Sequence, residues 1–360
     1  MSTHPVRFKP RKGRGAGFNP NNRFEQDQRA AFDDGWGALD EPLAPLRTTL
    51  GIDTARSIIS SNDSPDIPFD LSVNPYRGCE HGCVYCFARP THAYYGLSPG
   101  LDFESHLLYK PNAAELLRKE LSRKRYQCKP IALGINTDAY QPVERELKIT
   151  RQLLEVMHDF NQPVSIVTKS ALIERDLDLL VPMAKKNQVG VMLSITTLNH
   201  ELARKMEPRA TAPQRKLRTL KTLSEAGVPV GILIAPLIPA LNDAEMETIL
   251  QTCHEHGAAT AAYVMLRLPH EVKDLFETWL QDHYPLKAEH VLNLMRSIHS
   301  GKLYNAEFGA RMRGQGEYAD LLSKRFKLAC KRLGLNQERH SMDCSQFKAV
   351  EEDTGQLSLF

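Results

Sequence analysis

Cys79-Glu-His-Gly-Cys83-Val-Tyr-Cys86 places three thiols within eight residues, with the spacing C-x3-C-x2-C. A loop this short can turn all three thiols toward one centre, and thiolates are soft ligands that suit iron–sulfur clusters, zinc or copper(I). A closed zinc site takes four ligands, and a [4Fe–4S] cluster usually takes four thiolates. Three cysteines would therefore leave one iron open to a substrate or cofactor. The alternative is a zinc knuckle with His81 or a distant cysteine as fourth ligand.

The composition is that of an ordinary globular chain, with 42% hydrophobic and 25% charged residues among 360. Its net charge of +3 is too small to argue for nucleic acid by itself. The sequence contains no apolar run of about 18 residues, so we expect no transmembrane helix and no membrane partner. It also shows no apolar secretory segment at the N-terminus. Seven cysteines, three of them in one motif, fit a reducing cytoplasm better than a disulfide framework.

Residues 66–275 alternate apolar strands with amphipathic helices. Continuous apolar strands are expected in a parallel sheet that helices cover. Six strand–helix units in roughly 210 residues predict a partial (β/α)6 barrel, in which chemistry gathers at the carboxyl ends of the strands. The cysteine loop follows the first strand, as this rule requires. The predicted strands are 69–75, 131–135, 164–168, 189–195, 228–235 and 260–266, and the predicted helices are 113–121, 147–160, 172–184, 214–226 and 243–256.

The two ends of the chain differ from this core. Residues 1–65 form an N-terminal extension whose first 24 residues contain basic side chains and no acid: Arg7, Lys9, Arg11, Lys12, Arg14 and Arg23. This basic arm contacts the phosphates of a nucleic acid, or it is a solvated tail or a strap that lies over the domain. Residues 276–344 predict a helical C-terminal region, with helices at 292–298 and 318–333. The loop between them contains Arg311 and Arg313, which are suited to a phosphate or a carboxylate.

Polar phrases at the strand ends extend the pattern beyond the cysteines. The segment from Asn74 to Pro269 resembles the spore photolyase-like branch of the radical S-adenosylmethionine (radical SAM) superfamily, and more closely an uncharacterised bacterial family of DNA-repair photolyase-like proteins. The phrases that carry the resemblance are Asn74-Pro-Tyr-Arg-Gly-Cys79, Asn136-Thr-Asp-Ala-Tyr-Gln-Pro-Val-Glu-Arg145, Thr168-Lys-Ser170, Glu207-Pro-Arg209 and Ala235-Pro-Leu-Ile-Pro-Ala-Leu-Asn-Asp243.

The resemblance implies an α/β fold, a partial (β/α)6 TIM-like radical SAM barrel between the N-terminal extension and the helical C-terminal region. It implies an enzyme that uses a [4Fe–4S] cluster to cleave S-adenosylmethionine (SAM) reductively and to abstract a hydrogen atom from a substrate such as DNA. It also implies an electron donor such as flavodoxin or ferredoxin. Two alternatives remain: radical modification of RNA or protein, and a non-catalytic metal-binding accessory module of DNA repair.

Residue by residue, the resemblance assigns Cys79, Cys83 and Cys86 to the cluster. It implies that Tyr85 lies against the adenine of SAM, that Thr137 and Asp138 hold the methionine amino group, that Lys169 reaches the carboxylate or ribose, and that Ser194 binds the ribose or carboxylate. Each of the last three has a local alternative. Asp138 can cap a turn, Lys169 can be a surface charge, and Ser194 can bond the backbone.

Two positions depart from spore photolyase. Ile135 stands where that enzyme has a hydrogen-donating cysteine, and Phe87 stands where it has a tyrosine after the third cluster cysteine. The sequence therefore predicts a complete radical-generating apparatus without repair of the spore thymine photoproduct. Cys128 precedes the second strand and is expected at the other end of the barrel, and Cys253 is expected in the core.

Residues 345–360 are expected to form a flexible tail, which is polar and mixed as far as residue 355 and ends in Gln356-Leu357-Ser-Leu359-Phe360. The pentapeptide resembles the motif with which bacterial polymerases and repair proteins bind the DNA sliding clamp. There the glutamine bonds the groove and the Leu-Phe pair fills its pocket. The alternative is that the apolar residues pack back on the C-terminal region.

Overall fold

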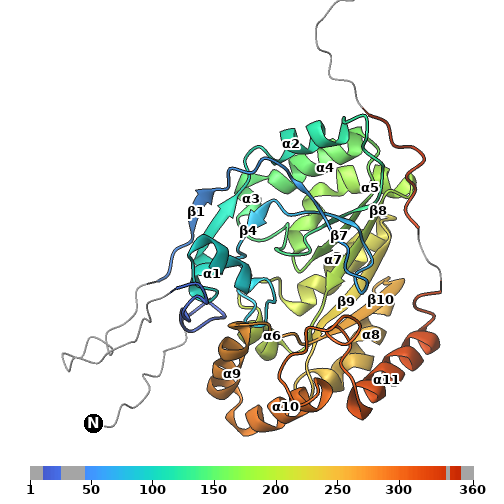
Figure 1. Cartoon of the computed structure of the whole chain (residues 1–360). Coiled ribbons are helices and arrows are strands. Elements are labelled where there is room, and N and C mark those ends of the chain that lie inside the picture. The colour runs from blue at the N-terminus through green and yellow to red at the C-terminus, as the bar shows by residue number, and fades with distance from the viewer. Residues whose placement is uncertain (1–10, 26–44, 338–340, 350–360) are drawn as a thin grey trace, which may run out of the picture.

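The computed structural model describes residues 11–25, 45–337 and 341–349. Among these residues, seven strands form one sheet in the order β10-β9-β8-β7-β6-β3-β2 (Figure 1). Neighbouring strands are parallel from β3 to β10, and β2 is antiparallel at the edge. These parallel strands confirm the predicted partial (β/α)6 barrel. The strands are β1 Thr49–Ile52, β2 Ile59–Ser61, β3 Leu71–Val73, β4 Tyr76–Arg77, β5 His106–Tyr109, β6 Ile131–Leu133, β7 Val164–Thr168, β8 Val189–Ser194, β9 Val230–Leu237 and β10 Thr260–Met265.

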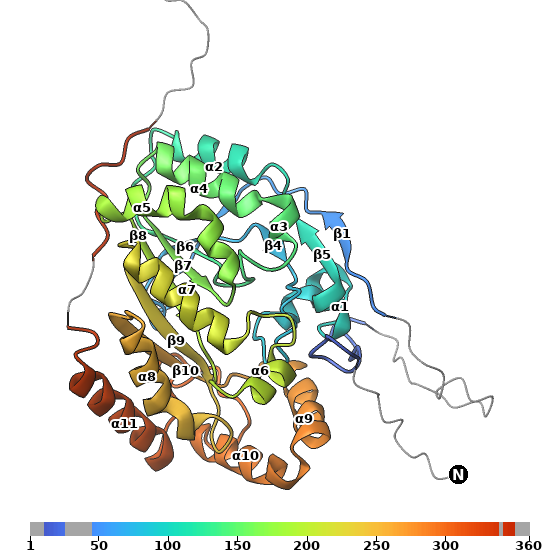
Figure 2. The same ribbon diagram turned by 180° about the vertical axis from the view of Figure 1, so that it is seen from behind.

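Helices cover the outside of this curved sheet, as Figures 1 and 2 show from opposite sides. The strands therefore bury both faces, and Ile131, Leu193 and Ile232 are fully buried. Burying each such side chain contributes about 1.5–3 kcal/mol to folding. The helices are α1 Leu101–Ser105, α2 Ala113–Leu121, α3 Glu144–Leu147, α4 Ile149–Asp159, α5 Leu177–Lys185, α6 His200–Met206, α7 Pro213–Glu225, α8 Met246–Glu255, α9 Val272–His283, α10 Pro285–Ile298 and α11 Glu317–Leu333, with 3-10 helices η1 Arg89–Tyr95, η2 Ala171–Asp176 and η3 Asp243–Glu245.

The predicted elements agree with the observed ones where the apolar pattern is long. Helix α2 and strand β7 have the predicted limits. The predicted helix 172–184 is instead the 3-10 helix η2 followed by α5. Helix α9 was missed although its apolar residues recur at helical spacing, and α10 begins seven residues before the predicted 292.

A second, small sheet supports the cysteine loop. Strand β5 pairs in parallel with β1 and antiparallel with β4, which ends two residues before Cys79. These strands have two to four residues, and β1 meets β5 more than 50 residues along the chain. Such short segments show no period, and therefore the sequence did not predict them. The predicted border at residue 65 lies between β2 and β3, and the one at 275 lies within α9.

Residues 11–25, which we call the N-terminal strap, pack against the cysteine loop. The guanidinium of Arg14 donates to the carbonyl oxygens of Glu104 and Leu46, at 2.6 and 2.7 Å. Arg23 forms an ion pair with Glu271 at 3.3 Å. The described part of the basic arm thus lies over the domain, as the strap alternative predicts, whereas residues 1–10 lie outside the described residues.

The C-terminal region closes two sides of the barrel. Arg311, after α10, donates to both carboxylate oxygens of Asp66, which lies between β2 and β3, at 2.8 and 2.5 Å. A carboxylate is thus one of the two partners predicted for Arg311, and the bridge spans the open side of the sheet between β10 and β2. Among the described residues, no helix is long and apolar enough to cross a membrane.

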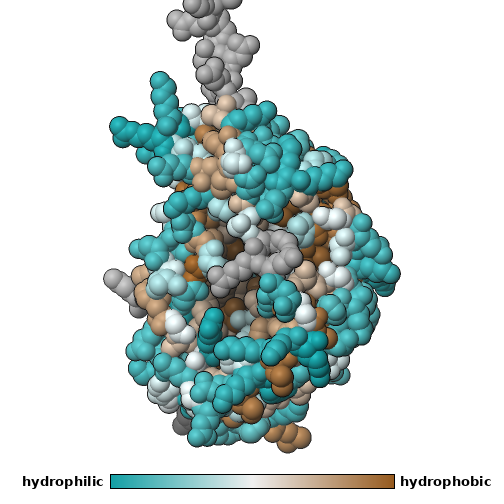
Figure 3. Space-filling model, turned by 90° about the vertical axis from the view of Figure 1, so that its right-hand side faces the viewer, coloured by the Kyte–Doolittle hydropathy of each residue, from teal (hydrophilic) through white to brown (hydrophobic). Residues whose placement is uncertain are grey.

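Residues 341–349 cross the amino ends of the strands. Asp343 N donates to Asn187 O, and the ring of Phe347 lies 5.4 Å from that of Tyr126. Figure 3 views the molecule from this side, where hydrophilic residues cover most of the surface and hydrophobic residues show near the centre. Gln356, Leu357, Leu359 and Phe360 lie outside the described residues.

Candidate functional site

The cysteine loop, residues 78–88, sits at the carboxyl end of β3, as predicted. Two glycines shape it: Gly78 and Gly82 have φ of +76° and +67°. A Cβ on Gly82 would lie 2.8 Å from the carboxylate of Glu104, and a Cβ on Gly15 of the strap would lie 1.8 Å from Gly82 O. The strap and the loop therefore touch through two residues that have no side chain.

The three cysteines of this loop are free thiols. Cys79 and Cys83 are buried and Cys86 is half-buried. Burial raises the pKa of all three thiols, to about 12 for Cys83. Buried thiols become thiolates only when a positive centre compensates the charge, so this soft donor set fits an iron–sulfur cluster. Among the described residues, no three His, Cys, Asp or Glu side chains are gathered tightly enough to hold a single metal ion.

Arg89 fixes the carboxyl end of the loop from inside the protein. Its Nε donates to Cys83 O at 2.9 Å, and its Nη1 donates to Pro99 O and Gly100 O at 3.1 and 2.8 Å. Its Nη2 lies 2.5 Å from Glu104 Oε1, and both side chains are fully buried. Glu104 also accepts hydrogen bonds from the backbone of the strap. Sequence reasoning missed this pair, because an arginine near cysteines gives no sign that it is buried.

Asp138 follows β6 and holds three strand ends together. Its Oδ1 accepts from Thr168 Oγ1 and Tyr140 N, at 2.7 and 2.9 Å. Its Oδ2 accepts from Lys169 N at 2.7 Å and lies 3.3 Å from His81 Nδ1, although the ring nitrogen is not aligned for a hydrogen bond. The interaction with His81 and these hydrogen bonds outweigh burial and lower the pKa of Asp138 to about 2.

These contacts bear on the turn-cap alternative for Asp138 and on the zinc-ligand alternative for His81. Asp138 does cap a turn, and Oδ1 is saturated by its two donors, so an ammonium group would have to bind at Oδ2. His81 Nδ1 faces Asp138, and nothing in its contacts supports the fourth ligand of a zinc site.

Lys169 and Ser194 meet at the ends of β7 and β8. Lys169 Nζ donates to Ser194 Oγ at 2.7 Å, and the Ser194 hydroxyl lies 3.5 Å from Ala235 O. Lys169 is partly buried rather than a surface charge, and nearby Glu207 and Cys83 outweigh its burial and raise its pKa. Thr137 is also buried and donates to Tyr76 O at 2.9 Å. The structure thus brings the predicted strand-end residues into one region, beside the thiols.

The side chain of Tyr85 enters a buried polar network. Its hydroxyl donates to Glu207 Oε1, which also accepts from Thr196 Oγ1 at 2.7 Å. Glu207 Oε2 accepts from Lys216 Nζ at 2.9 Å. Glu207 belongs to one of the phrases that carry the resemblance, but its network partners were not predicted, because α7 presents Lys216 like any basic residue of an amphipathic helix.

The two positions that depart from spore photolyase lie near the loop. Phe87 is 40% exposed, and the guanidinium carbon of Arg267, just after β10, lies 4.7 Å from its ring centre. Ile135 follows β6 and is half-buried. Cys128, by contrast, precedes β6 and lies near Gln162 at the amino ends of the strands, and Cys253 is fully buried in α8, both as expected.

Comparison with known proteins identifies the class that this fold and loop define. Residues 73–253, half of the chain, match the model of the Radical SAM superfamily. The chain belongs to this superfamily, and its class is the radical SAM enzymes, for which the family implies SAM and an iron–sulfur cluster. The cysteine loop and the residues at the ends of β6, β7 and β8 all fall within the matched region.

Two proteins that are similar to this chain in sequence are uncharacterized. A protein of Mycobacterium tuberculosis (strain H37Rv) is 35% identical over 221 residues, which cover 61% of this chain and 65% of that protein. A protein of Methanocaldococcus jannaschii is 30% identical over 222 residues, which cover 61% of this chain and 79% of that protein. The chain thus spans less than two thirds of the mycobacterial relative.

Among solved structures, the chain resembles spore photoproduct lyase. A variant of that enzyme gives a TM-score of 0.57 at 15% identity, covering 79% of this chain and 80% of the other. Spore photoproduct lyase complexed with dinucleoside spore photoproduct gives 0.56 at 14% identity, with the same coverage. At this identity the likeness shows the fold, and it confirms the predicted similarity to the photolyase-like branch.

Proposed function

We propose that the chain is a radical SAM enzyme that holds one [4Fe–4S] cluster on Cys79, Cys83 and Cys86. The observation that carries the proposal is the set of three thiols, two buried and one half-buried, at the carboxyl end of β3, beside Lys169 and Asp138. When bound, such a cluster would supply the electron for reductive cleavage of SAM, the chemistry that would allow abstraction of a hydrogen atom from the substrate.

The chain's own residues bind and orient the cofactor. Asp138 Oδ2 offers a charged acceptor for the methionine amino group, and Lys169 offers a charged donor for its carboxylate. Ser194 and Thr137 supply hydroxyls beside them. Tyr85, whose hydroxyl is held by Glu207, keeps its ring in a fixed place for the adenine. The strap and the Arg89–Glu104 pair cover the loop and keep water from the thiols.

We further propose that the substrate is carried in DNA. The similarity in fold to a lyase solved with a dinucleoside photoproduct and the clamp-like tail support this proposal. Ile135 and Phe87 argue for a lesion other than the spore photoproduct. Modification of RNA or protein by the same chemistry is the alternative. The electron donor would be a flavodoxin or ferredoxin, and seven free cysteines support a cytoplasmic location.

Anaerobic reconstitution tests the proposal. The wild-type chain should hold about four irons and four sulfides, and it should release 5′-deoxyadenosine from SAM on reduction. Cys86→Ala should lose both properties, whereas Cys253→Ala, which removes a thiol in the core, should retain them. A full cluster in Cys86→Ala would overturn the assignment. Products formed with DNA, RNA or protein substrates then decide among the substrate classes.

A further inference from the structure

A hollow of about 190 Å³ opens outside the cysteine loop, at the ends of three neighbouring strands. Tyr140 and Arg145 line it after β6, and Ser170 lines it after β7. Arg209 and Thr211, beyond α6, form the third wall, and His81 of the cysteine loop completes it. We call it the arginine hollow. None of the described residues that line it has a carboxylate, although two have guanidinium groups.

Arg145 is the cation with the greatest freedom in this hollow. It is exposed, and its side chain makes no hydrogen bond or ion pair with the described residues. The preceding residue, Glu144, does not neutralise it, because the Glu144 carboxylate is fully buried and accepts from Arg175 Nη2 at 2.7 Å. The charge of Arg145 therefore faces the hollow and the solvent.

Arg209 supplies the second charge. Its Nη1 lies 2.9 Å from Glu80 Oε1, and its side chain is 34% exposed. Glu80 offsets part of this charge, but Arg14 of the strap also lies nearby, because burial and the charge of Arg209 both lower the pKa of Arg14. Glu104 and Glu80 both act on Arg14, so the uncompensated positive charge at the hollow is that of Arg145.

Two hydroxyl groups line the hollow as potential donors. Thr211 Oγ1 accepts from Ala171 N at 2.9 Å, and Ser170 Oγ accepts from Leu172 N at 3.2 Å. Because a backbone N–H occupies a lone pair of each oxygen, each hydroxyl proton is left to donate to a ligand. Hydroxyl donors beside guanidinium groups suit a phosphate, to which arginine offers bidentate hydrogen bonds.

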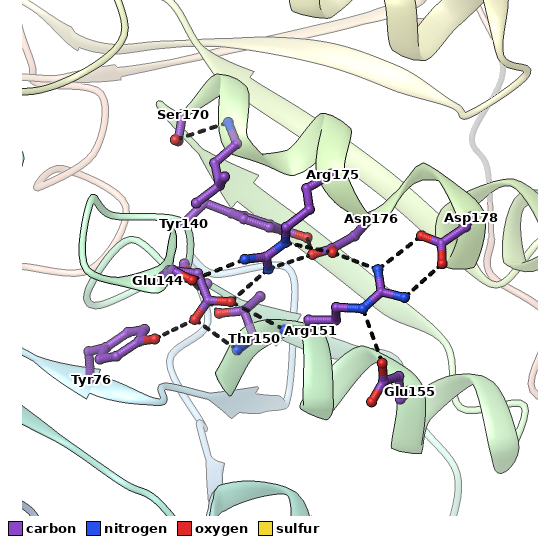
Figure 4. Close-up of polar contacts among 12 residues, drawn as sticks. Tyr76, Tyr140, Glu144, Thr150, Arg151, Glu155, Ser170, Arg175, Asp176 and Asp178 are labelled. Atoms are coloured by element: carbon purple, nitrogen blue, oxygen red, sulfur yellow. Dashed lines mark hydrogen bonds and ion pairs between the residues drawn. The ribbon is translucent and has the colours of Figure 1, made fainter. Parts of the chain in front are cut away.

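A buried network fixes the walls, as Figure 4 shows. The Tyr140 hydroxyl donates to Asp176 Oδ2 at 3.0 Å, and Asp176 Oδ1 is bound by Arg151 Nη1 at 3.0 Å and Arg175 Nε at 2.9 Å. This network ties the loop after β6 to η2 and α5. It therefore holds Tyr140 and Ser170 in place without using Arg145.

We propose that the arginine hollow is a binding site for a phosphate group, held by Arg145 and Arg209. Three of the phrases that carry the family resemblance contribute residues to it, among them Arg145, Ser170 and Arg209. None of the proposed SAM contacts lines the hollow, and His81, which does line it, lies 3.3 Å from Asp138. A phosphate here would anchor a nucleic acid or a smaller phosphate ester beside the cluster loop, and this link to the substrate rests on the proposed function.

Calorimetric titration of the reconstituted full chain with inorganic phosphate tests the site, at constant ionic strength and without SAM. We expect a dissociation constant of about 1 mM. Arg145→Gln should weaken phosphate binding at least tenfold. Arg145→Lys should weaken it less, because lysine keeps the positive charge but cannot donate the bidentate hydrogen bonds of a guanidinium group. Arg123→Gln, which removes an exposed arginine just after α2, is the matched control and should bind like the wild type.

A parallel titration with a short single-stranded oligonucleotide distinguishes the sources of the phosphate. Weaker binding of both ligands by Arg145→Gln indicates a nucleic-acid backbone, and weaker binding of inorganic phosphate alone indicates a small phosphate ester. Absence of phosphate binding, or equal affinities in Arg145→Gln and the wild type, would overturn the site. Release of 5′-deoxyadenosine in the same preparations reports separately on the proposed function.

Discussion

Lys216 Nζ lies 2.9 Å from Glu207 Oε2, and each side chain is only 3% exposed. This ion pair joins α7 to the tyrosine that precedes the third cysteine, because Glu207 also accepts from the Tyr85 hydroxyl. Charges buried this deeply are stable only as a pair. The packing around Tyr85 therefore depends on an interaction more than 120 residues away in the sequence.

Glu207→Gln should destabilise the chain by about 3–5 kcal/mol, because it leaves the Lys216 ammonium buried without a counter-charge. Urea unfolding of the cluster-free chain measures the change. The matched control is Glu201→Gln, which removes an exposed i,i+4 partner of Lys205 and should leave the midpoint unchanged. Equal midpoints for Glu207→Gln and the wild type would contradict the role of the pair.

The same pair predicts a dependence on pH. The charges of Lys216 and Lys169 and the hydrogen bonds outweigh burial and lower the pKa of Glu207 to about 2, from an ordinary value near 4.5. The pair's stabilisation should be fully present above pH 4.5 and should fall as pH drops toward 2, by on the order of 3 kcal/mol. Unfolding midpoints between these pH values should fall less steeply for Glu207→Gln than for the wild type.

Arg89→Lys should lower the iron content of the reconstituted chain. Lysine keeps the charge opposite Glu104 but loses the fork that binds Cys83 O, Pro99 O and Gly100 O together. Iron and sulfide per chain and the rate at which air bleaches the visible absorbance are the measurements. Arg118→Lys, in an exposed pair with Asp159, is the control. If the visible absorbance of Arg89→Lys bleaches at the wild-type rate, the guanidinium hydrogen bonds of Arg89 do not hold the loop.

Asp138→Asn should retain the cluster but weaken SAM binding by about 1.5–3 kcal/mol, because a charge-assisted bond is lost. Asparagine can still accept from Thr168 and Tyr140 at Oδ1, so the turn should survive, although its Nδ2 cannot accept from Lys169 N. Asp138→Ala would remove both the turn cap and the charged acceptor for SAM. Calorimetry with SAM measures the affinity, and Thr168→Val serves as a control that removes one donor without changing charge. Unchanged affinity in Asp138→Asn would leave Asp138 as a turn cap alone.

The reconstituted enzyme should not repair the spore thymine photoproduct, because Ile135 cannot donate a hydrogen atom as a cysteine does and Phe87 lacks a phenol. The assay supplies the dinucleoside photoproduct with SAM and a reductant, with spore photoproduct lyase as positive control. Efficient repair would refute this interpretation of the two positions.

A peptide ending in Gln356-Leu-Ser-Leu-Phe360 should bind the bacterial sliding clamp with micromolar affinity, about −8 kcal/mol. Deletion of Leu359 and Phe360 should abolish binding, because the pair supplies the apolar anchors. Calorimetry with the peptide and with the full chain measures it, and a scrambled peptide is the control. Absence of binding in both would remove the tail's support for a DNA substrate.

The sequence by itself determined the barrel and the cysteine loop. Apolar runs such as 164–168 and helical spacing such as 113–121 follow local periods that packing in a parallel barrel does not override. The strand-end phrases also predicted that Asp138, Lys169 and Ser194 converge, because parallel strands bring their carboxyl ends to one edge.

Tertiary structure decided which polar residues are buried in pairs. Arg89 with Glu104 and Glu207 with Lys216 look like surface charges in sequence, because the burial of a charge depends on partners brought together by packing rather than on its neighbours in the chain. The strap's position over the loop was one of several alternatives for the same reason. A short irregular segment has no period of its own, and the contact of Gly15 with Gly82 exists only once β4, β5 and the loop have folded.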